Sequence, residues 1–200
     1  AQMVGLEKFK KFLNSLELFN RIDFELDEIG TPIPFRWGKC KLATASYGHG
    51  ITTTPLQLAK AYSIIGNGGY KIKPTLIKNN QGIKFQQQVI SNKTSNQLNT
   101  ILRKVVSHEE GTANFANIEG YEVAGKTGTA LKYNSKEKIN TFASLFPASN
   151  PKYVLVVLLD EPKIAEPDHI FVRPDGKKYK NIKRNEAGWN AVIIAGKIIE

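Results

Sequence analysis

One short stretch of the sequence combines a cation, two hydroxyl groups and bare backbone: residues 123–130 read VAGKTGTA. Its first residues are apolar, as at the start of a buried strand. Side chains alternate along a strand, so Lys126 and Gly128 should point to one side and Thr127 and Thr129 to the other. A glycine inside a strand often marks a place where a ligand or another backbone approaches closely. The pattern therefore predicts a strand that offers charge, hydroxyls and open backbone to a ligand.

Two other residues, a histidine and a cysteine, are of types that often take part in catalysis. His49 lies between two glycines, and we interpret it as a turn residue at a close chain approach, because no catalytic partner is near it in the sequence. Cys40 is the only cysteine, so no internal disulfide can form, and we expect its side chain to be buried or half-buried. No zinc-site spacing occurs, so we predict neither a metal nor a cofactor.

The chain is basic, with a net charge of +10 over 200 residues. Such a charge would suit an acidic partner such as nucleic acid, anionic lipid or an anionic polymer. However, Lys supplies 23 of the 28 basic residues, and they are scattered along the chain. No basic helix interleaved with aromatic residues occurs. We therefore interpret the charge as a solvated surface and predict no binding of nucleic acid.

The length suits one domain with a real core, or a large piece of one. No apolar run reaches the roughly 18–20 residues that a membrane-spanning helix needs. Residues 1–6 resemble the inside of a helix, and Glu200 closes an apolar helical pattern without a stop signal. We therefore expect the chain to be a fragment of a longer protein.

The first half of the chain reads as helices followed by two short strands. Apolar residues recur every three or four positions over 1–14, which predicts an amphipathic helix. Thr54 is a good helix N-cap and is followed by proline, so a second helix should run over 55–65. Residues 70–77 and 83–90 read as two strands joined by a polar turn.

The second half reads as a helix, three strands and a final helix. The expected elements are a helix over 94–108 with Ile101 on its buried face, a strand carrying Lys126–Gly128, strands over 141–146 and 153–159, a hairpin turn at 174–177 and a helix over 187–200. The run 154–159 has no polar alternation, as expected for a central strand buried on both faces. The fold class is therefore α/β of the α+β type, with an antiparallel sheet flanked by helices.

Several short motifs occur together in this order. They are SYGHG at 46–50, TPLQLA at 54–59, NGG at 67–69, AGKTGTA at 124–130, FPA at 146–148, PKYV at 151–154, DEP at 160–162 and GWNA at 188–191. Together they resemble the C-terminal part of the transpeptidase domain of class B penicillin-binding proteins, in which Lys-Thr-Gly is the third motif. The GWNA motif is most similar to division-specific members.

The resemblance implies a penicillin-binding protein/β-lactamase-like fold, present here as its C-terminal half. The family's nucleophile is the Ser of Ser-x-x-Lys. That string occurs only at Ser135 and Ser149, both in polar turns, and no Ser-x-Asn occurs. We therefore expect residues 1–200 to be a partial transpeptidase domain that starts after these two motifs. Residues 163–186 are longer and more basic than the resemblance implies, and we interpret them as a charged insertion.

The reaction implied by the resemblance is serine acyl transfer, which cross-links peptidoglycan stem peptides ending in D-Ala-D-Ala. Lys126 and Thr129 are then the catalytic residues of this chain, and Thr127, Gly128 and Thr129 bind substrate. The implied partners are stem peptides, β-lactam antibiotics and divisome membrane proteins. The implied location is the outer side of the cytoplasmic membrane, held there by an anchor that these residues do not contain. Without the nucleophile, this fragment alone should be inactive.

Three other functions fit parts of the sequence. A β-lactamase or a β-lactam sensor would share the Lys-Thr-Gly motif, and a lactamase differs in hydrolysing its acyl group quickly. A catalytically inactive fragment could act only as a binding module through 163–186. A basic nucleic-acid-binding domain ranks last, and salt-dependent binding would reveal it.

Overall fold

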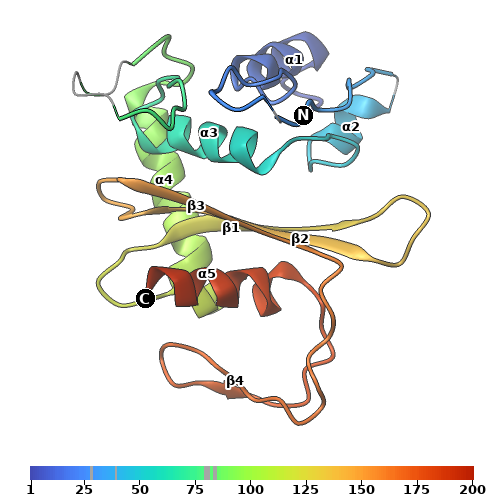
Figure 1. Ribbon diagram of the computed structural model, residues 1–200, viewed down its shortest axis with the longest axis vertical. Helices are drawn as coiled ribbons and strands as arrows, with labels where there is room; N and C mark the ends of the chain where they lie inside the picture. The colour runs from blue at the N-terminus through green and yellow to red at the C-terminus, as the bar shows by residue number, and fades with distance from the viewer. Residues whose placement is uncertain (28, 39, 79–81, 83–84) are drawn as a thin grey trace. The chain divides into compact units, whose positions relative to one another are not determined.

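The computed structural model describes residues 1–27, 29–38, 40–78, 82 and 85–200. The chain folds into two compact units, Ala1–Ser95 and Asn96–Glu200 (Figure 1). The boundary falls within helix α4 (Asn92–Ser107), which confirms the helix predicted over 94–108. Among the residues described, no helix has the length and apolar character needed to cross a membrane.

The first unit is helical. It contains α1 (Leu6–Ser15), α2 (Lys41–Ala45) and α3 (Pro55–Gly66), which confirms the helix predicted over 55–65. The helix predicted over 1–14 is confirmed from Leu6 onwards. The expectation that residues 1–6 resemble the inside of a helix is wrong, because Gly5, with φ +81°, is the N-cap of α1. At the start of α3, Thr54 Oγ1 accepts a hydrogen bond from Gln57 N at 3.2 Å, and Gln57 Oε1 accepts one from Thr54 N at 2.8 Å. This reciprocal pair satisfies two backbone donors that the helix itself leaves open.

Two other expectations for the first unit are wrong. Among the described residues, 70–77 and 85–90 do not form two strands. Their pairing consists of a bridge between Tyr70 and Gln88 and of four backbone hydrogen bonds that join residues 69–71 to residues 86–90. Pro74 has no N–H to continue a ladder. Residues 79–81, 83 and 84 of this prediction lie outside the described residues. Cys40 is exposed, because it lies at the start of the short surface helix α2.

The second unit is built on a sheet of three antiparallel strands. The strands are β1 (Ala124–Leu131), β2 (Lys138–Phe146) and β3 (Tyr153–Asp160), in the order β1-β2-β3. The three consecutive strands are therefore confirmed. The central strand is β2, however, and not the apolar run 154–159, which belongs to β3 at the edge of the described sheet. The expected burial on both faces is also wrong for the described chain, since Val157 is the buried residue of β3 and Leu158 is 44% exposed. An apolar run therefore specifies neither a strand's position in the sheet nor the burial of both its faces.

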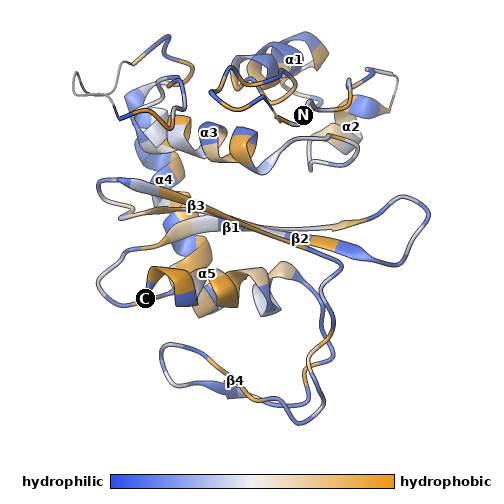
Figure 2. Cartoon of the chain, in the orientation of Figure 1, coloured by the Kyte–Doolittle hydropathy of each residue, from blue (hydrophilic) through white to orange (hydrophobic). Residues whose placement is uncertain are grey.

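A helix at the end of the chain covers one face of this sheet (Figure 1). The short 3₁₀ helix η2 (Ala187–Trp189) leads into α5 (Ala191–Ile199), in place of the single helix predicted over 187–200. Hydrophobic residues occupy most of α5 (Figure 2). The buried core includes Phe142 and Val157 from the sheet, Val106 from α4, and Val192 and Ala195 from α5. Ile101 was expected to join this core but is 58% exposed.

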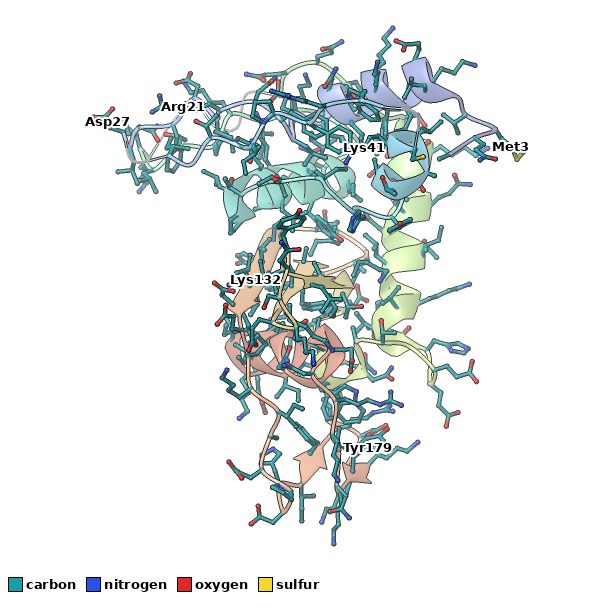
Figure 3. The ribbon with its side chains drawn as sticks, turned by 90° about the vertical axis from the view of Figure 1, so that its right-hand side faces the viewer. Met3, Arg21, Asp27, Lys41, Lys132 and Tyr179 are labelled. Atoms are coloured by element: carbon teal, nitrogen blue, oxygen red, sulfur yellow. The ribbon has the colours of Figure 1, made fainter. Side chains whose placement is uncertain are left out.

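The charged segment 163–186 contains a small hairpin. Strands β4 (Phe171–Val172) and β5 (Lys178–Tyr179) pair around the turn predicted at 174–177. In that turn Gly176 has φ +83°, a conformation that favours glycine. In Figures 1 and 3 the hairpin lies on the far side of α5 from the sheet.

Candidate active site

The Lys-Thr-Gly residues lie on β1, an edge strand of the sheet. Directly after β1, Lys132 donates its backbone N–H to the Glu137 carbonyl at 2.9 Å, so the backbone groups of Lys132 face β2. The pairing of β1 with β2 is regular, and in an antiparallel ladder alternate residues face the partner strand. Thr127 and Thr129 therefore direct their N–H and C=O groups away from β2. Consistently, the Thr127 carbonyl accepts a hydrogen bond from Lys126 Nζ at 2.9 Å.

The two glycines of this stretch have different physical requirements. A Cβ atom on Gly125 would lie 2.7 Å from both the Ala143 carbonyl oxygen and the Phe142 ring, so packing excludes any side chain there. A Cβ atom on Gly128 would meet nothing closer than 3.9 Å, at Thr141. Gly128 also has no positive φ that would favour glycine. Within the described residues, the fold requires glycine at 125 but not at 128, so Gly128 keeps a space open.

The hydroxyls of Thr127 and Thr129 are held in place by residues outside the strand. Thr127 Oγ1 lies 3.1 Å from Thr112 Oγ1, with either oxygen able to donate. Thr129 Oγ1 accepts a hydrogen bond from the Ala187 N–H at 3.0 Å. Because Thr129 accepts in this bond, its own proton remains available to a ligand. The pair can offer hydroxyl donors to an anion such as a carboxylate.

Lys126 supplies positive charge at this edge. Its side chain is exposed, and its recorded hydrogen bonds are to the Thr127 carbonyl at 2.9 Å and to Thr127 Oγ1 at 3.4 Å. In the part of the chain that the structure describes, Lys126 forms no ion pair. Lys132, by contrast, bonds to Asp160 at 2.7 Å and Glu161 at 2.6 Å, and these bonds raise the pKa of the Lys132 ammonium. Of these two cations, Lys126 is the one whose charge is not neutralised by a carboxylate.

A pocket of about 630 Å³ adjoins both threonines. Its wall also includes Thr112 and Phe115 after α4, Tyr179 and Arg184 from the charged segment, and Trp189 from η2. Sequence reasoning assigned none of these residues to the site. The one available signal was the presence of aromatic residues in the otherwise charged segment 163–186, since such residues need somewhere to pack.

Four aromatic rings attach the hairpin to this pocket. The Trp189 ring centroid lies 5.4 Å from Phe115, 5.4 Å from Phe171 and 5.3 Å from Tyr179, all in edge-to-face or nearly perpendicular contacts. Phe171 is only 8% exposed. Tyr179, on β5, is labelled in Figure 3. Such contacts stabilise an arrangement beyond the area they bury, so the cluster attaches the hairpin to Trp189, which lines the same pocket as Thr127 and Thr129.

The pocket carries charges of both signs. Arg173 is held by Asp175 at 2.7 Å and donates to the Tyr179 hydroxyl at 3.2 Å. Arg184 also lines the pocket, and no hydrogen bond or ion pair is recorded for it within the described ranges. Glu109 and Glu110, just after α4, line the pocket without an ion pair among those residues. The pocket therefore suits a ligand that carries both charges.

The remaining candidates from the sequence lie elsewhere. Ser135 lies in the turn between β1 and β2, and Ser149 in the turn between β2 and β3, so neither opens a buried helix. His49 lies in the turn that follows α2, as expected for a turn residue. Within the residues described, no three His, Cys, Asp or Glu side chains are grouped as metal ligands would be.

Comparison with known proteins relates this chain to one family. Residues 1–183 match the model of the penicillin-binding protein transpeptidase domain. The chain is 32% identical to the probable peptidoglycan D,D-transpeptidase FtsI of Caulobacter vibrioides, over all of this chain and 34% of that protein. It is 35% identical to stage V sporulation protein D of Bacillus subtilis, over 82% of this chain and 28% of that protein. The chain thus spans about a third of the length of these relatives.

Solved structures agree with this relationship. The transpeptidase domain of Burkholderia pseudomallei penicillin-binding protein 3 superposes with a TM-score of 0.72 at 30% identity, covering 78% of this chain and 50% of that one. A peptidoglycan glycosyltransferase from Burkholderia ambifaria gives a TM-score of 0.71 at 31% identity, covering 78% and 49%. These likenesses confirm the predicted fold.

Proposed function

Because this chain belongs to the penicillin-binding protein transpeptidase domain family, we propose that it supplies the Lys-Thr-Gly part of the active site of a peptidoglycan D,D-transpeptidase. The observation that carries the proposal is the free edge of β1. There the backbone groups of Thr127 and Thr129 face away from the sheet, and Gly128 leaves open space beside them. A peptide can pair with such an edge as an added strand.

Lys126 contributes positive charge. It attracts the terminal carboxylate of a stem peptide ending in D-Ala-D-Ala, and it tunes proton transfer at the nucleophile. This role is supported by the exposed side chain and by the lack of an ion pair among the described residues. Because no carboxylate neutralises Lys126, its charge remains available to a ligand.

Thr129 serves the reaction in two ways. Its backbone N–H is the second donor of the oxyanion hole, the first being the N–H of the nucleophile itself, and loss of one such donor typically costs about 10²–10³ in rate. Its hydroxyl, together with that of Thr127, binds the terminal carboxylate of the substrate. Both roles are supported by the outward-facing backbone and the available hydroxyl proton of Thr129.

The nucleophilic serine comes from a part of the protein outside these 200 residues, and the chain alone does not react. The two Ser-x-x-Lys strings of this chain lie in turns, where no buried helix positions the hydroxyl. The share of the relatives that this chain spans, about a third, is consistent with a site completed by other segments. We further propose a role in cell division, with divisome partners and action on the outer side of the cytoplasmic membrane, as the resemblance to division-specific members implies.

Labelling of the intact protein with a fluorescent penicillin tests this function. A transpeptidase should form a covalent adduct that persists for many minutes after excess penicillin is removed. Rapid release of the label, with many penicillin molecules hydrolysed per protein, would indicate a β-lactamase instead. Absence of any adduct would leave only a non-catalytic binding role.

A further inference from the structure

This inference rests on the proposed function, which fixes where the pocket beside Thr127 and Thr129 lies relative to the scissile peptide bond of the donor. In that function the two hydroxyls bind the carboxylate of the last residue of the donor peptide, which is the residue that leaves. The pocket is lined by both of these threonines. It therefore adjoins the leaving-group side of the scissile bond and not the side that holds the rest of the donor.

The second half of the reaction uses this same side. The amine of an acceptor peptide attacks the carbonyl carbon of the acyl-serine ester, a C–N bond forms, the C–O bond to serine breaks, and the amine proton ends on the serine oxygen. The new C–N bond replaces the one that was cleaved, so the acceptor amine must occupy the position vacated by the leaving residue. Productive attack requires that the acceptor be held there in a near-attack geometry.

The pocket has the size and chemistry to hold such an acceptor. Its volume of about 630 Å³ is within the range of sites that bind small ligands and exceeds the need of one departed alanine. Phe115, Tyr179 and Trp189 form an aromatic wall. Arg184 can pair with a carboxylate, and Glu110 can attract an ammonium group. An acceptor stem peptide carries both an amine and carboxylates.

We propose that this pocket is the acceptor subsite of the transpeptidase, and that the hairpin of the charged segment is the element that forms it. The hairpin supplies Tyr179, and Arg184 follows it in the same segment. The segment therefore determines which acceptor is used, through pairing of an acceptor carboxylate with Arg184.

The test measures how the acyl-enzyme of the intact protein is consumed. The donor is a peptide ending in D-Ala-D-Ala. One acceptor is free D-alanine, which reaches only the threonine hydroxyls. The other is the tripeptide L-alanyl-γ-D-glutamyl-meso-diaminopimelic acid, which also extends into the pocket. The readout is the ratio of tripeptide product to D-alanine product. Both products form from the same acyl-enzyme, so a change in the rate of acylation does not alter this ratio.

Arg184→Ala should lower this ratio about 10-fold, the typical effect of losing a hydrogen bond between charged groups. Arg184→Lys should recover most of it. Lys183→Ala removes the neighbouring cation, which does not line the pocket, and should leave the ratio as in the wild type. Tyr179→Ala should also lower the ratio by removing part of the aromatic wall, in a protein whose folding is verified by circular dichroism.

Two results would overturn the acceptor subsite while leaving the proposed function intact. One is an unchanged ratio in both Arg184→Ala and Tyr179→Ala. The other is an equal fall in Lys183→Ala, which would indicate a general charge effect. If the wild-type protein formed no acyl-enzyme at all, the proposed function would fail, and the subsite with it.

Discussion

The hydroxyl oxygen of Thr129 accepts a hydrogen bond at 3.0 Å from the backbone N–H of Ala187. This bond joins the edge strand β1 to the start of η2. Ala187 is fully buried, so the bond has a structural effect as well as an effect on the site. It orients the Thr129 side chain so that the hydroxyl proton points elsewhere.

Replacement of Thr129 by Val should therefore harm both stability and reaction. The Ala187 N–H would be buried without a partner, which typically costs about 1–3 kcal/mol. Acylation by penicillin should fall about 10- to 100-fold, because a hydrogen bond to a charged group is lost. Thr129→Ser keeps the hydroxyl and should retain most of both properties. Urea unfolding and acylation kinetics of the two variants check this. Equal unfolding free energies and equal acylation rates of Thr129→Val and Thr129→Ser would contradict it.

Lys126→Ala should affect reaction but not folding. Among the described residues, the exposed side chain bonds only to its neighbour Thr127, so the free energy of unfolding should change by less than about 0.5 kcal/mol. Acylation by penicillin should fall at least about 100-fold, the usual size of a contribution to proton transfer. The same two measurements on Lys163→Ala serve as a surface control. A large loss of stability in Lys126→Ala would mean that this lysine is structural.

Gly128 and Gly125 provide a matched pair of substitutions. Gly128→Val places its side chain in open space, so the protein should fold and yet fail to be acylated, because the side chain occupies the position of the substrate. Gly125→Val forces contacts of 2.7 Å with β2 and should lower the free energy of unfolding by about 1–3 kcal/mol or more. Normal penicillin labelling of Gly128→Val would rule out the model in which substrate lies along this edge.

Phe171→Ala should release the hairpin from the second unit. Phe171 is 8% exposed and contacts the rings of Phe115 and Trp189, so truncation of a buried phenylalanine should cost about 3–5 kcal/mol locally. Val172→Ala alters the neighbouring residue, which is 53% exposed, and should change little. Hydrogen exchange over residues 171–179 should accelerate in the first variant only. Equal protection in both would show that the aromatic cluster does not hold the hairpin.

The stability of the first unit should depend on pH through Glu17. Partial burial alone would raise the pKa of this carboxyl, but hydrogen bonds and charges from Lys60 and Lys71 outweigh that effect and lower the pKa. A carboxyl with a lowered native pKa stabilises the fold above its unfolded pKa of about 4.3, and this contribution is lost as pH falls through the native value.

The corresponding variant is Glu17→Gln. The difference in unfolding free energy between the wild type and this variant should be largest above about pH 5 and should shrink as the pH is lowered towards 3. Glu7→Gln is the control, since the Glu7 side chain is 84% exposed. Urea unfolding at several pH values measures the difference. A difference that stays constant with pH would disprove the role of Glu17.

The sequence predicted the elements whose signals are local. The helix α3 was recognisable from Thr54 and Pro55, and the cap is present in the structure. The three antiparallel strands followed from apolar runs separated by turn residues, and the hairpin turn at 174–177 followed from its proline, aspartate and glycine. These signals depend on neighbours within a few residues, which is why they can be read from the chain alone.

Features that depend on distant contacts were missed. No local signal connects Phe115 with Phe171 and Tyr179, yet the Phe115 ring centroid lies 6.2 Å from that of Phe171 and 5.9 Å from that of Tyr179. The position of β3 at the edge of the described sheet depends on which strands pair, and not on its own composition. The exposure of Ile101 likewise depends on what packs against α4. The chemistry of the candidate site was therefore predictable along β1, but the pocket beside it was not.

The central claim is that residues 126–129 form one part of an acylation site whose nucleophile lies elsewhere in the protein. Intact-mass analysis after incubation with benzylpenicillin, followed by peptide mapping, tests it most directly. We predict one penicillin per molecule of the intact protein, on a serine outside residues 1–200, and no adduct on the isolated chain. An adduct on one of the serines of this chain, or none on the intact protein, would contradict the claim.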